Sequence, residues 1–148
     1  RFAEFIETFE STSSLVVTDH GGRVVKTIGD EIMFVVADVE AAAEIALTLA
    51  RRPSDLDGRP ELHVGLAYGP VLRHLGDVYG TVVNLASRLA SLARPGTVLV
   101  DRTMATSLTD TPRYSTRPLR QVTLRGFPRL QPWLLRHAAQ DWSAVEST

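Results

Sequence analysis

The chain has 148 residues, of which 44% are hydrophobic and 22% charged, and its formal net charge is -1. These values are typical of one globular domain, and the small charge gives no electrostatic basis for DNA or RNA as the main partner. There is no cysteine, which excludes a disulfide scaffold and fits a reducing, cytoplasmic setting. The longest apolar run, residues 32–37, is far shorter than the roughly 18–20 residues of a membrane span.

The N-terminal segment predicts a helix over about residues 2–18, because apolar residues recur every three to four positions from Phe2 to Phe9. The cluster His20-Gly21-Gly22 should end this helix. The chain opens inside the helix rather than at a methionine, so we expect it to be a piece of a longer protein. That protein is expected to carry regulatory domains, and it could be anchored at a membrane.

Two β-branched runs follow, Arg23–Ile28 and Ile32–Val36, and they predict a β-hairpin around Gly29-Asp30. Asp38 is a suitable N-cap for the alanine-rich segment 39–51, which predicts a second helix.

The second half of the chain predicts short elements connected by turns. They are a loop at 52–60, a strand at 62–67, a short hairpin partner at 71–72, a helix at 80–93, a strand at 97–100, a helix at 102–108, an irregular stretch at 109–118, and strands at 119–125 and 131–137. The predicted fold class is α+β over a single domain, residues 1–148. A strand before Arg1 would complete a ferredoxin-like βαββαβ unit, followed by extra C-terminal strands.

The first segment with chemical potential is Lys26-Thr27-Ile28-Gly29-Asp30. Gly29 removes side-chain bulk, so that the backbone can come close to a ligand. Asp30 can offer a carboxylate to Mg²⁺, which prefers one or two carboxylates together with substrate phosphates. On its own, this motif is more typical of a hairpin with a surface charge pair.

The second segment runs from Asp77 to Arg88. Asn84 and Arg88 are four residues apart and project from one face of the predicted helix, whereas Leu85 and Leu89 belong to the buried face. Such a pair could orient a sugar and neutralise charge on a phosphate. Alone, the pair is more typical of a solvated helix face.

Together the two segments resemble the catalytic domain of class III adenylyl and guanylyl cyclases. In that family a Lys-x-x-Gly-Asp hairpin is followed, some forty to fifty residues later, by Asp-x-x-Gly-x-x-x-Asn-x-x-x-Arg. The corresponding segments here are KTIGDEIMF and GDVYGTVVNLASRL, and the later RPGTVLVD and TLRGFPRLQPWLL are similar to the closing strands of the family. The resemblance covers about residues 2–137.

The resemblance implies a role for each matching residue. Asp30 falls on the second metal-binding aspartate, Asn84 on the residue that orients the ribose, and Arg88 on the residue that stabilises charge at the α-phosphate. Arg73 and Arg125 are weaker candidates for contacts with the triphosphate.

Lys26 and Asp77 fall on the pair that reads the purine. Adenine presents a ring-nitrogen acceptor beside an amino donor, which a lysine donor and an aspartate acceptor match. Guanine presents the reverse, so the pair favours ATP over GTP.

The implied reaction is attack of the ribose 3′-hydroxyl on the α-phosphate of ATP, with two Mg²⁺ (or Mn²⁺) ions per active site and pyrophosphate as leaving group. The implied partner is a second copy of the chain. In the family each active site takes its metal aspartates from one chain and its other residues from the second, so Lys26 and Asp30 would serve different sites of a homodimer.

The sequence departs from the family pattern at its N-terminus. The first metal aspartate normally lies in a Phe-x-Asp-x-x-Gly-Phe-Thr segment ahead of the first helix, and no such segment is present. We therefore expect the 148 residues alone to bind Mg²⁺-ATP weakly and to turn over little or not at all.

Three alternatives stay open at this point. The first is a catalytically silent cyclase-like domain that acts in dimerisation or regulation. The second is a diguanylate cyclase, whose Gly-Gly-Asp/Glu-Glu-Phe turn differs from Ile28-Gly29-Asp30-Glu31. The third is a ferredoxin-like RNA-binding module, which needs exposed aromatics on central strands, whereas the two predicted hairpin strands contain only Phe34.

Overall fold

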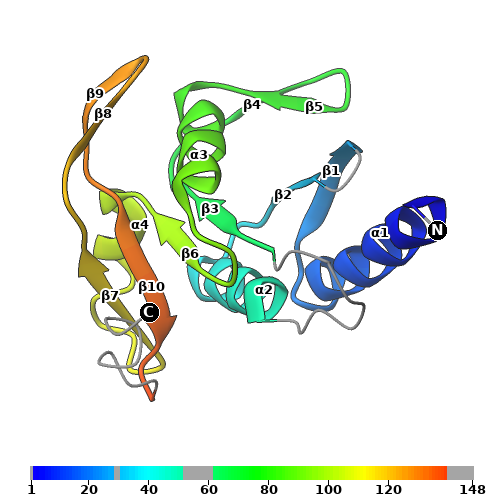
Figure 1. Cartoon of the computed structure of the whole chain (residues 1–148), viewed down its shortest axis with the longest axis horizontal. Coiled ribbons are helices and arrows are strands. Elements are labelled where there is room, and N and C mark those ends of the chain that lie inside the picture. Colours follow the sequence, from blue (N-terminus) through cyan, green and yellow to red (C-terminus); the bar gives the residue numbers. More distant parts are fainter. Residues whose placement is uncertain (1, 29–30, 52–61, 140–148) are drawn as a thin grey trace.

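The computed structural model describes residues 2–28, 31–51 and 62–139 (Figure 1). Its elements are α1 (Phe2–Asp19), β1 (Arg23–Ile28), β2 (Glu31–Val35), α2 (Val39–Arg51), β3 (Val64–Leu66), β4 (Leu72–His74), β5 (Asp77–Tyr79), α3 (Thr81–Leu92), β6 (Val98–Val100), α4 (Arg102–Ser107), β7 (Tyr114–Pro118), β8 (Val122–Leu124), β9 (Phe127–Leu130) and β10 (Trp133–His137).

Among the described residues, four strands form a sheet in the order β3-β6-β10-β7. The edge strand β3 runs parallel to β6, whereas β10 is antiparallel to both of its neighbours. The remaining strands pair as separate antiparallel hairpins, β1–β2, β4–β5 and β8–β9. The parallel contact between β3 and β6 requires a crossover, and α3 lies in the connection between the two strands.

Alternating residues of the sheet pack into two separate cores, one on each face. Val98 and Val100 of β6 belong to a core that includes Ile45 of α2, whereas Leu99 between them belongs to a core that includes Leu89 of α3. This alternation follows from the two-residue period of a strand. The sheet therefore separates α2 from α3, and α1 packs beside α2 and the β1–β2 hairpin (Figure 1).

Two aspartates fix the starts of helices. Asp38 accepts a hydrogen bond from the backbone N–H of Ala41 at 3.0 Å, as expected for the N-cap of α2. Asp101 is the N-cap of α4 and accepts from Met104 N at 2.9 Å. It also accepts from Tyr68 N at 3.3 Å, which ties the segment after β3 to α4. Burial raises the pKa of Asp101, although its backbone hydrogen bonds act in the opposite direction.

A polar cluster around Glu44 joins α2 to β7 and β10. Tyr114 Oη donates to Glu44 Oε1 at 2.7 Å, His137 Nε2 lies 3.1 Å from the same oxygen, and Arg113 Nη2 lies 3.4 Å from it. Burial acts to raise the pKa of Glu44, but the hydrogen bonds from Tyr114 and His137, with the nearby positive charges, outweigh burial and lower this pKa.

We expect Glu44→Gln to lower the free energy of unfolding at pH 7 by about 1.5–3 kcal/mol, the range for hydrogen bonds to a charged group. The lowered pKa stabilises the fold above the ordinary glutamate pKa, and this contribution is lost as the pH falls through the lowered value. The difference between wild type and Glu44→Gln should therefore shrink below about pH 4. Urea unfolding of both proteins at several pH values measures this difference in the free energy of unfolding.

Glu7→Gln is the matched control, because it removes the same charge at an exposed position of α1. Equal stability loss in both variants at pH 7 would contradict the role assigned to the Glu44 cluster.

The element predictions are largely confirmed. Helices expected at 2–18, 39–51, 80–93 and 102–108 are present within one or two residues of these bounds. The prediction of an irregular stretch over 109–118 is confirmed for residues 109–113 but wrong for Tyr114–Pro118, because this segment forms β7 and pairs along its length with β10. The turn Gly29-Asp30, the loop 52–60 and the side chains of Phe2, Phe5 and Ile6 lie outside what the structure describes. Within the described parts of the chain, no helix combines the length and apolarity needed to cross a bilayer.

Candidate active site

The structure brings together Lys26 and Asp77, which are 51 residues apart in the sequence. Lys26 Nζ lies 2.8 Å from Asp77 Oδ2 and donates a hydrogen bond to it. Lys26 comes from β1 and Asp77 from the start of β5. Their side chains are 40% and 27% exposed, respectively, so a ligand from solvent can reach both.

Each partner stabilises the charged form of the other. The hydrogen bond to Asp77 is the main reason that the pKa of Lys26 is raised, against a smaller opposing effect of desolvation. The same hydrogen bond lowers the pKa of Asp77, with a further contribution from the backbone N–H of Val78, which donates to Asp77 Oδ1 at 2.7 Å. The site therefore presents a fixed ammonium beside a fixed carboxylate at neutral pH.

A β-bulge determines the face on which Lys26 lies. Val24 pairs with Phe34 and Lys26 pairs with Met33, so Val25 is an extra residue in β1. Val24 and Phe34 pack against the core on the α2 side. In a regular strand Lys26 would share the face of Val24, but one extra residue reverses the alternation. Lys26 thereby points away from that core and can meet Asp77.

Gly80 connects β5 directly to α3. It is the N-cap of this helix and has φ 133°, a conformation that favours glycine. Its carbonyl accepts from the backbone N–H groups of Val83 and Asn84 at 3.1 and 3.2 Å. Because the helix starts so soon after β5, Asp77 lies on the strand that leads straight into the first turn of α3.

Asn84 and Arg88 are both exposed on α3, as their spacing predicts. The buried face of the helix consists of Leu89, with Leu85 and Leu92 packed partly buried in the same core. The predicted division of α3 into a polar and an apolar face is confirmed.

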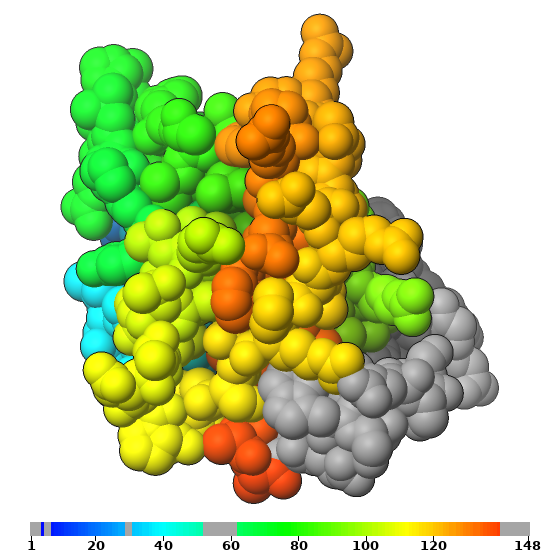
Figure 2. All heavy atoms as spheres, turned by 90° about the vertical axis from the view of Figure 1, so that its left-hand side faces the viewer, coloured from blue at the N-terminus to red at the C-terminus, as the bar shows by residue number. Residues whose placement is uncertain are grey.

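Arg73 and Arg125, the weaker candidates for triphosphate contacts, are both exposed on hairpins. Arg73 is exposed on β4 and pairs across the hairpin with Val78, so it lies on the opposite face from Asp77. Arg125 is exposed in the turn of the β8–β9 hairpin, which extends beyond the ends of β7 and β10 and forms the orange projection at the top of Figure 2. Asp30, the predicted metal ligand, lies outside the described residues.

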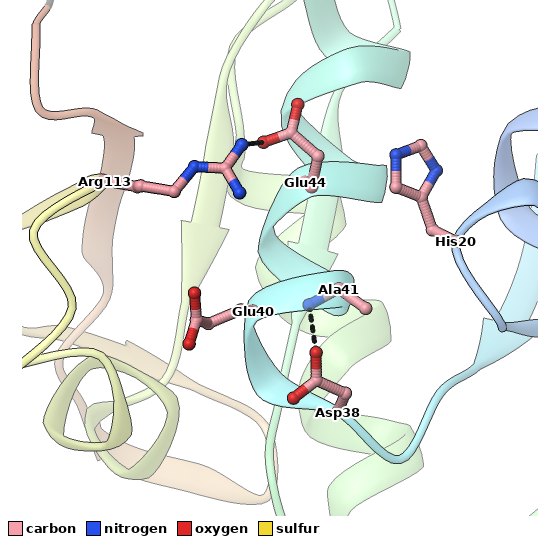
Figure 3. Close-up of a pocket in the computed structure, with 6 residues that line it drawn as sticks. All are labelled: His20, Asp38, Glu40, Ala41, Glu44 and Arg113. Carbon is pink, nitrogen blue, oxygen red and sulfur yellow. Dashed lines mark hydrogen bonds and ion pairs between the residues drawn. The ribbon is translucent and has the colours of Figure 1, made fainter.

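A pocket of about 410 Å³ lies elsewhere, at the N-terminal end of α2 (Figure 3). It is lined by His20, Asp38, Glu40, Ala41, Glu44 and Arg113. Its carboxylates outnumber its basic groups, which is unfavourable for a triphosphate, and Asp38 and Glu44 are engaged in the helix cap and the polar cluster. None of its lining residues belongs to the elements that carry the predicted site, so we assign the pocket a structural role.

The sequence as a whole matches a known family. The family model for the adenylate and guanylate cyclase catalytic domain matches residues 3–137. The chain belongs to this family. A similar cyclase is the adenylate cyclase of Streptomyces coelicolor, which is 40% identical in an alignment that covers 89% of this chain and 42% of that protein. Another is the adenylate cyclase of Glutamicibacter nicotianae, 39% identical over 90% of this chain and 33% of that protein. The cyclase domain thus spans less than half the length of these relatives.

Solved cyclase domains share the fold. The adenylyl cyclase CyaB from P. aeruginosa superimposes with a TM-score of 0.75 over 94% of this chain and 84% of that chain, at 18% identity. The catalytic core of a rhodopsin-guanylyl cyclase with converted specificity, in complex with ATPalphaS, gives a TM-score of 0.73 over 88% of this chain and 80% of that chain, at 21% identity. The predicted α+β cyclase fold is confirmed.

Sequence reasoning missed two features of the cyclase domain's site. The extra residue Val25 has no signature in a run of β-branched residues, so the bulge could not be predicted. The second feature is His63, and its Nδ1 lies 2.6 Å from the carbonyl oxygen of Ala90 in α3. In the sequence, His63 is an ordinary polar residue at the start of a predicted strand. The alternation His63-Val64-Gly65-Leu66 is the one signal that could have placed His63 on the α3 side of β3.

Proposed function

We propose that this domain is the catalytic part of an adenylate cyclase, which converts ATP to 3′,5′-cyclic AMP and pyrophosphate. The observation that carries the proposal is the ion pair between Lys26 of β1 and Asp77 of β5, whose charged atoms lie 2.8 Å apart. The strand β5 leads into α3, the helix that bears Asn84 and Arg88. The names of the relatives from Streptomyces coelicolor and Glutamicibacter nicotianae support it.

The Lys26–Asp77 pair has hydrogen-bonding capacity left for adenine. The ammonium of Lys26 has three N–H donors, of which Asp77 uses one, and the carboxylate of Asp77 has acceptor positions beyond those taken by Lys26 and Val78 N. Lys26 can therefore donate to the ring nitrogen of adenine while Asp77 accepts from the amino group. Guanine would place a hydrogen-bond donor against the Lys26 ammonium and an acceptor against the Asp77 carboxylate. Lys26 and Asp77 would then each lose a hydrogen bond to the base.

Asn84 and Arg88 are proposed to act on the other half of the nucleotide. The Asn84 amide can both donate to and accept from ribose hydroxyls, which would orient the 3′-hydroxyl toward the α-phosphate. The guanidinium of Arg88 can form paired hydrogen bonds with phosphate oxygens and would stabilise the charge that develops there as the 3′-oxygen attacks and pyrophosphate leaves.

The two Mg²⁺ (or Mn²⁺) ions are proposed for the site on the strength of Asp30 alone. Within residues 2–28, 31–51 and 62–139 there is no group of three or more histidine, cysteine, aspartate or glutamate side chains able to hold a metal ion. The described residues do not by themselves make a metal site, so we assign no step to a metal through them.

A homodimer is proposed from the exposed apolar surface of the β4–β5 hairpin. Leu72 and Leu75 are 66% and 90% exposed, and Tyr79 is 49% exposed. A group of large apolar side chains on one projecting hairpin is typical of an interaction site. A solved relative, the guanylyl cyclase domain of a RhoGC fusion protein from Blastocladiella emersonii, is described as a non-canonical dimer.

The function is tested by measuring cyclic nucleotide formation from ATP and from GTP, with Mg²⁺ or Mn²⁺, in a longer protein in which a segment precedes Arg1. We expect cyclic AMP from ATP, little product from GTP, and loss of product in Asp30→Ala. A folded dimer that forms no product from either nucleotide would instead identify the catalytically silent regulatory domain. Robust activity of residues 1–148 alone would contradict the expectation that they are insufficient.

A further inference from the structure

The helix that carries Asn84 and Arg88 rests directly on the backbone of β3. A Cβ atom added to Gly65 would lie 2.9 Å from the Cα of Ala90, and it would overlap the carbonyl oxygen of Ala86 and the amide nitrogen of Ala90. These are backbone atoms, so no side-chain rotation could make room. A glycine within a strand commonly marks such a close approach. Only glycine at position 65 is compatible with the observed distance between α3 and β3.

His63 holds the same helix by a hydrogen bond. It lies two residues before Gly65 and therefore on the same side of the chain, whereas Val64 and Leu66 face the core on the α2 side. His63 Nδ1 lies 2.6 Å from the carbonyl oxygen of Ala90. A carbonyl oxygen only accepts, so Nδ1 must carry a hydrogen and donate. Ala90 is in the last turn of α3, and its carbonyl oxygen also accepts from the backbone N–H of the C-cap residue Ala93 at 3.3 Å.

The face of α3 that contacts β3 is opposite to the face proposed for catalysis. Ala86 and Ala90 are four residues apart and share one face. Asn84 and Arg88 each precede one of these alanines by two residues, which is a rotation of roughly 200° around a helix. A displacement of α3 away from β3 would therefore carry Asn84 and Arg88 together in one direction.

Lys26 would not follow such a displacement, because β1 pairs with β2 and does not belong to the sheet that contains β3. Asp77 is on β5, which leads directly into α3. The distance between Lys26 and the catalytic face of α3 thus depends on how closely α3 rests on β3.

We propose that His63 and Gly65 are positioning residues, which set the location of the catalytic face of α3 relative to the bound nucleotide. Gly65 permits the close approach, and His63 fixes the helix along its axis. Both act through α3 and neither is assigned a contact with substrate. The inference rests on the proposed roles of Asn84 and Arg88.

The kinetic test uses Gly65→Ala in the longer protein described above. A shift of about 1 Å in a catalytic group can cost up to 10²-fold in rate, so we expect kcat to fall by about 10- to 100-fold. The KM for ATP should change less than kcat, because Lys26 on β1 stays in place. Val64→Ala is the matched control. It alters the adjacent residue on the opposite face of β3 and should lower thermal stability while kcat is retained.

A second readout does not depend on activity. In the 148-residue chain labelled with ¹⁵N-histidine, we expect His63 to show a protonated Nδ1 in the wild type and in Val64→Ala, and to lose this signature in Gly65→Ala. Retention of the signature in Gly65→Ala would overturn the proposal. If the wild type makes no cyclic nucleotide, the proposed function fails, and this NMR comparison alone decides whether Gly65 and His63 position α3.

A milder pair of variants applies if Gly65→Ala does not fold. His63→Ala removes the donor at an exposed position, and we expect a several-fold lower kcat, in line with about 1 kcal/mol for one hydrogen bond. His63→Asn places an amide nitrogen near the former Nδ1 and should restore most of the rate. Equal kcat in wild type, His63→Ala and His63→Asn would overturn the role of His63.

Discussion

Replacement of Arg88 by alanine is expected to lower kcat for cyclic AMP formation by about 10²–10³-fold, the loss typical of removing one group that stabilises developing charge. The KM for ATP should change much less, because the guanidinium is proposed to act mainly in the transition state. Steady-state kinetics of the longer protein measure both constants. Arg94→Ala is the matched control, since Arg94 is an exposed arginine just beyond α3 and has no assigned role. A kcat for Arg88→Ala equal to that of Arg94→Ala would contradict the assignment.

Mixing of two inactive variants tests whether Arg88 acts across the proposed dimer. If metal ligands and Arg88 reach one site from different chains, Arg88→Ala and Asp30→Ala can complement each other. Random assortment should restore about a quarter of wild-type activity, because half of the dimers are mixed and each mixed dimer has one intact site. No recovery, with subunit exchange demonstrated, would indicate that both residues serve the same site within a chain.

The second large effect concerns the choice of nucleotide. In the double variant Lys26→Glu/Asp77→Lys the ion pair is retained but its donor and acceptor exchange places. We expect the preference to move from ATP toward GTP by about 30- to 150-fold in kcat/KM, since two hydrogen bonds at about 1–1.5 kcal/mol each change partners. Competition between ATP and GTP, with both cyclic products quantified, measures the shift.

Two controls separate base reading from a general loss of structure. Asp77→Asn keeps an acceptor for the adenine amino group and should keep the preference for ATP at a lower rate. Lys26 is the only lysine among the 148 residues. Lysine labelling therefore gives one side-chain NMR signal in the wild type and one in the exchanged variant, which shows directly whether the ion pair forms again. An unchanged preference with the pair intact would exclude base reading by these two residues.

Local patterns predicted the helices well. The segment 39–51 was bounded by an N-cap aspartate and by a change in composition, and α2 occupies the same residues. Local patterns failed at β7, where Tyr114–Pro118 contains polar residues and a proline. An edge strand tolerates polar residues and a proline, because one side of its backbone needs no hydrogen-bond partner. Only the pairing with β10 makes this segment a strand.

The residues of the proposed site were named through the resemblance to the cyclase family, whose motifs combine residue types at fixed spacing. The distance of four between Asn84 and Arg88 is sufficient to place them on one helix face. The resemblance also assigns Lys26 and Asp77 to reading the base, and the preference for adenine then follows from a lysine donor beside an aspartate acceptor.

What the sequence by itself determined is therefore the family, the order of most elements and the chemical character of the site. The tertiary structure alone decided that Lys26 meets Asp77 at 2.8 Å, through a bulge that reverses the strand alternation, and that α3 is held against β3 by Gly65 and His63. The contacts between Lys26 and Asp77 and between β3 and α3 join residues 21 to 51 positions apart. Such contacts arise from the packing of whole elements, which no local period or motif encodes.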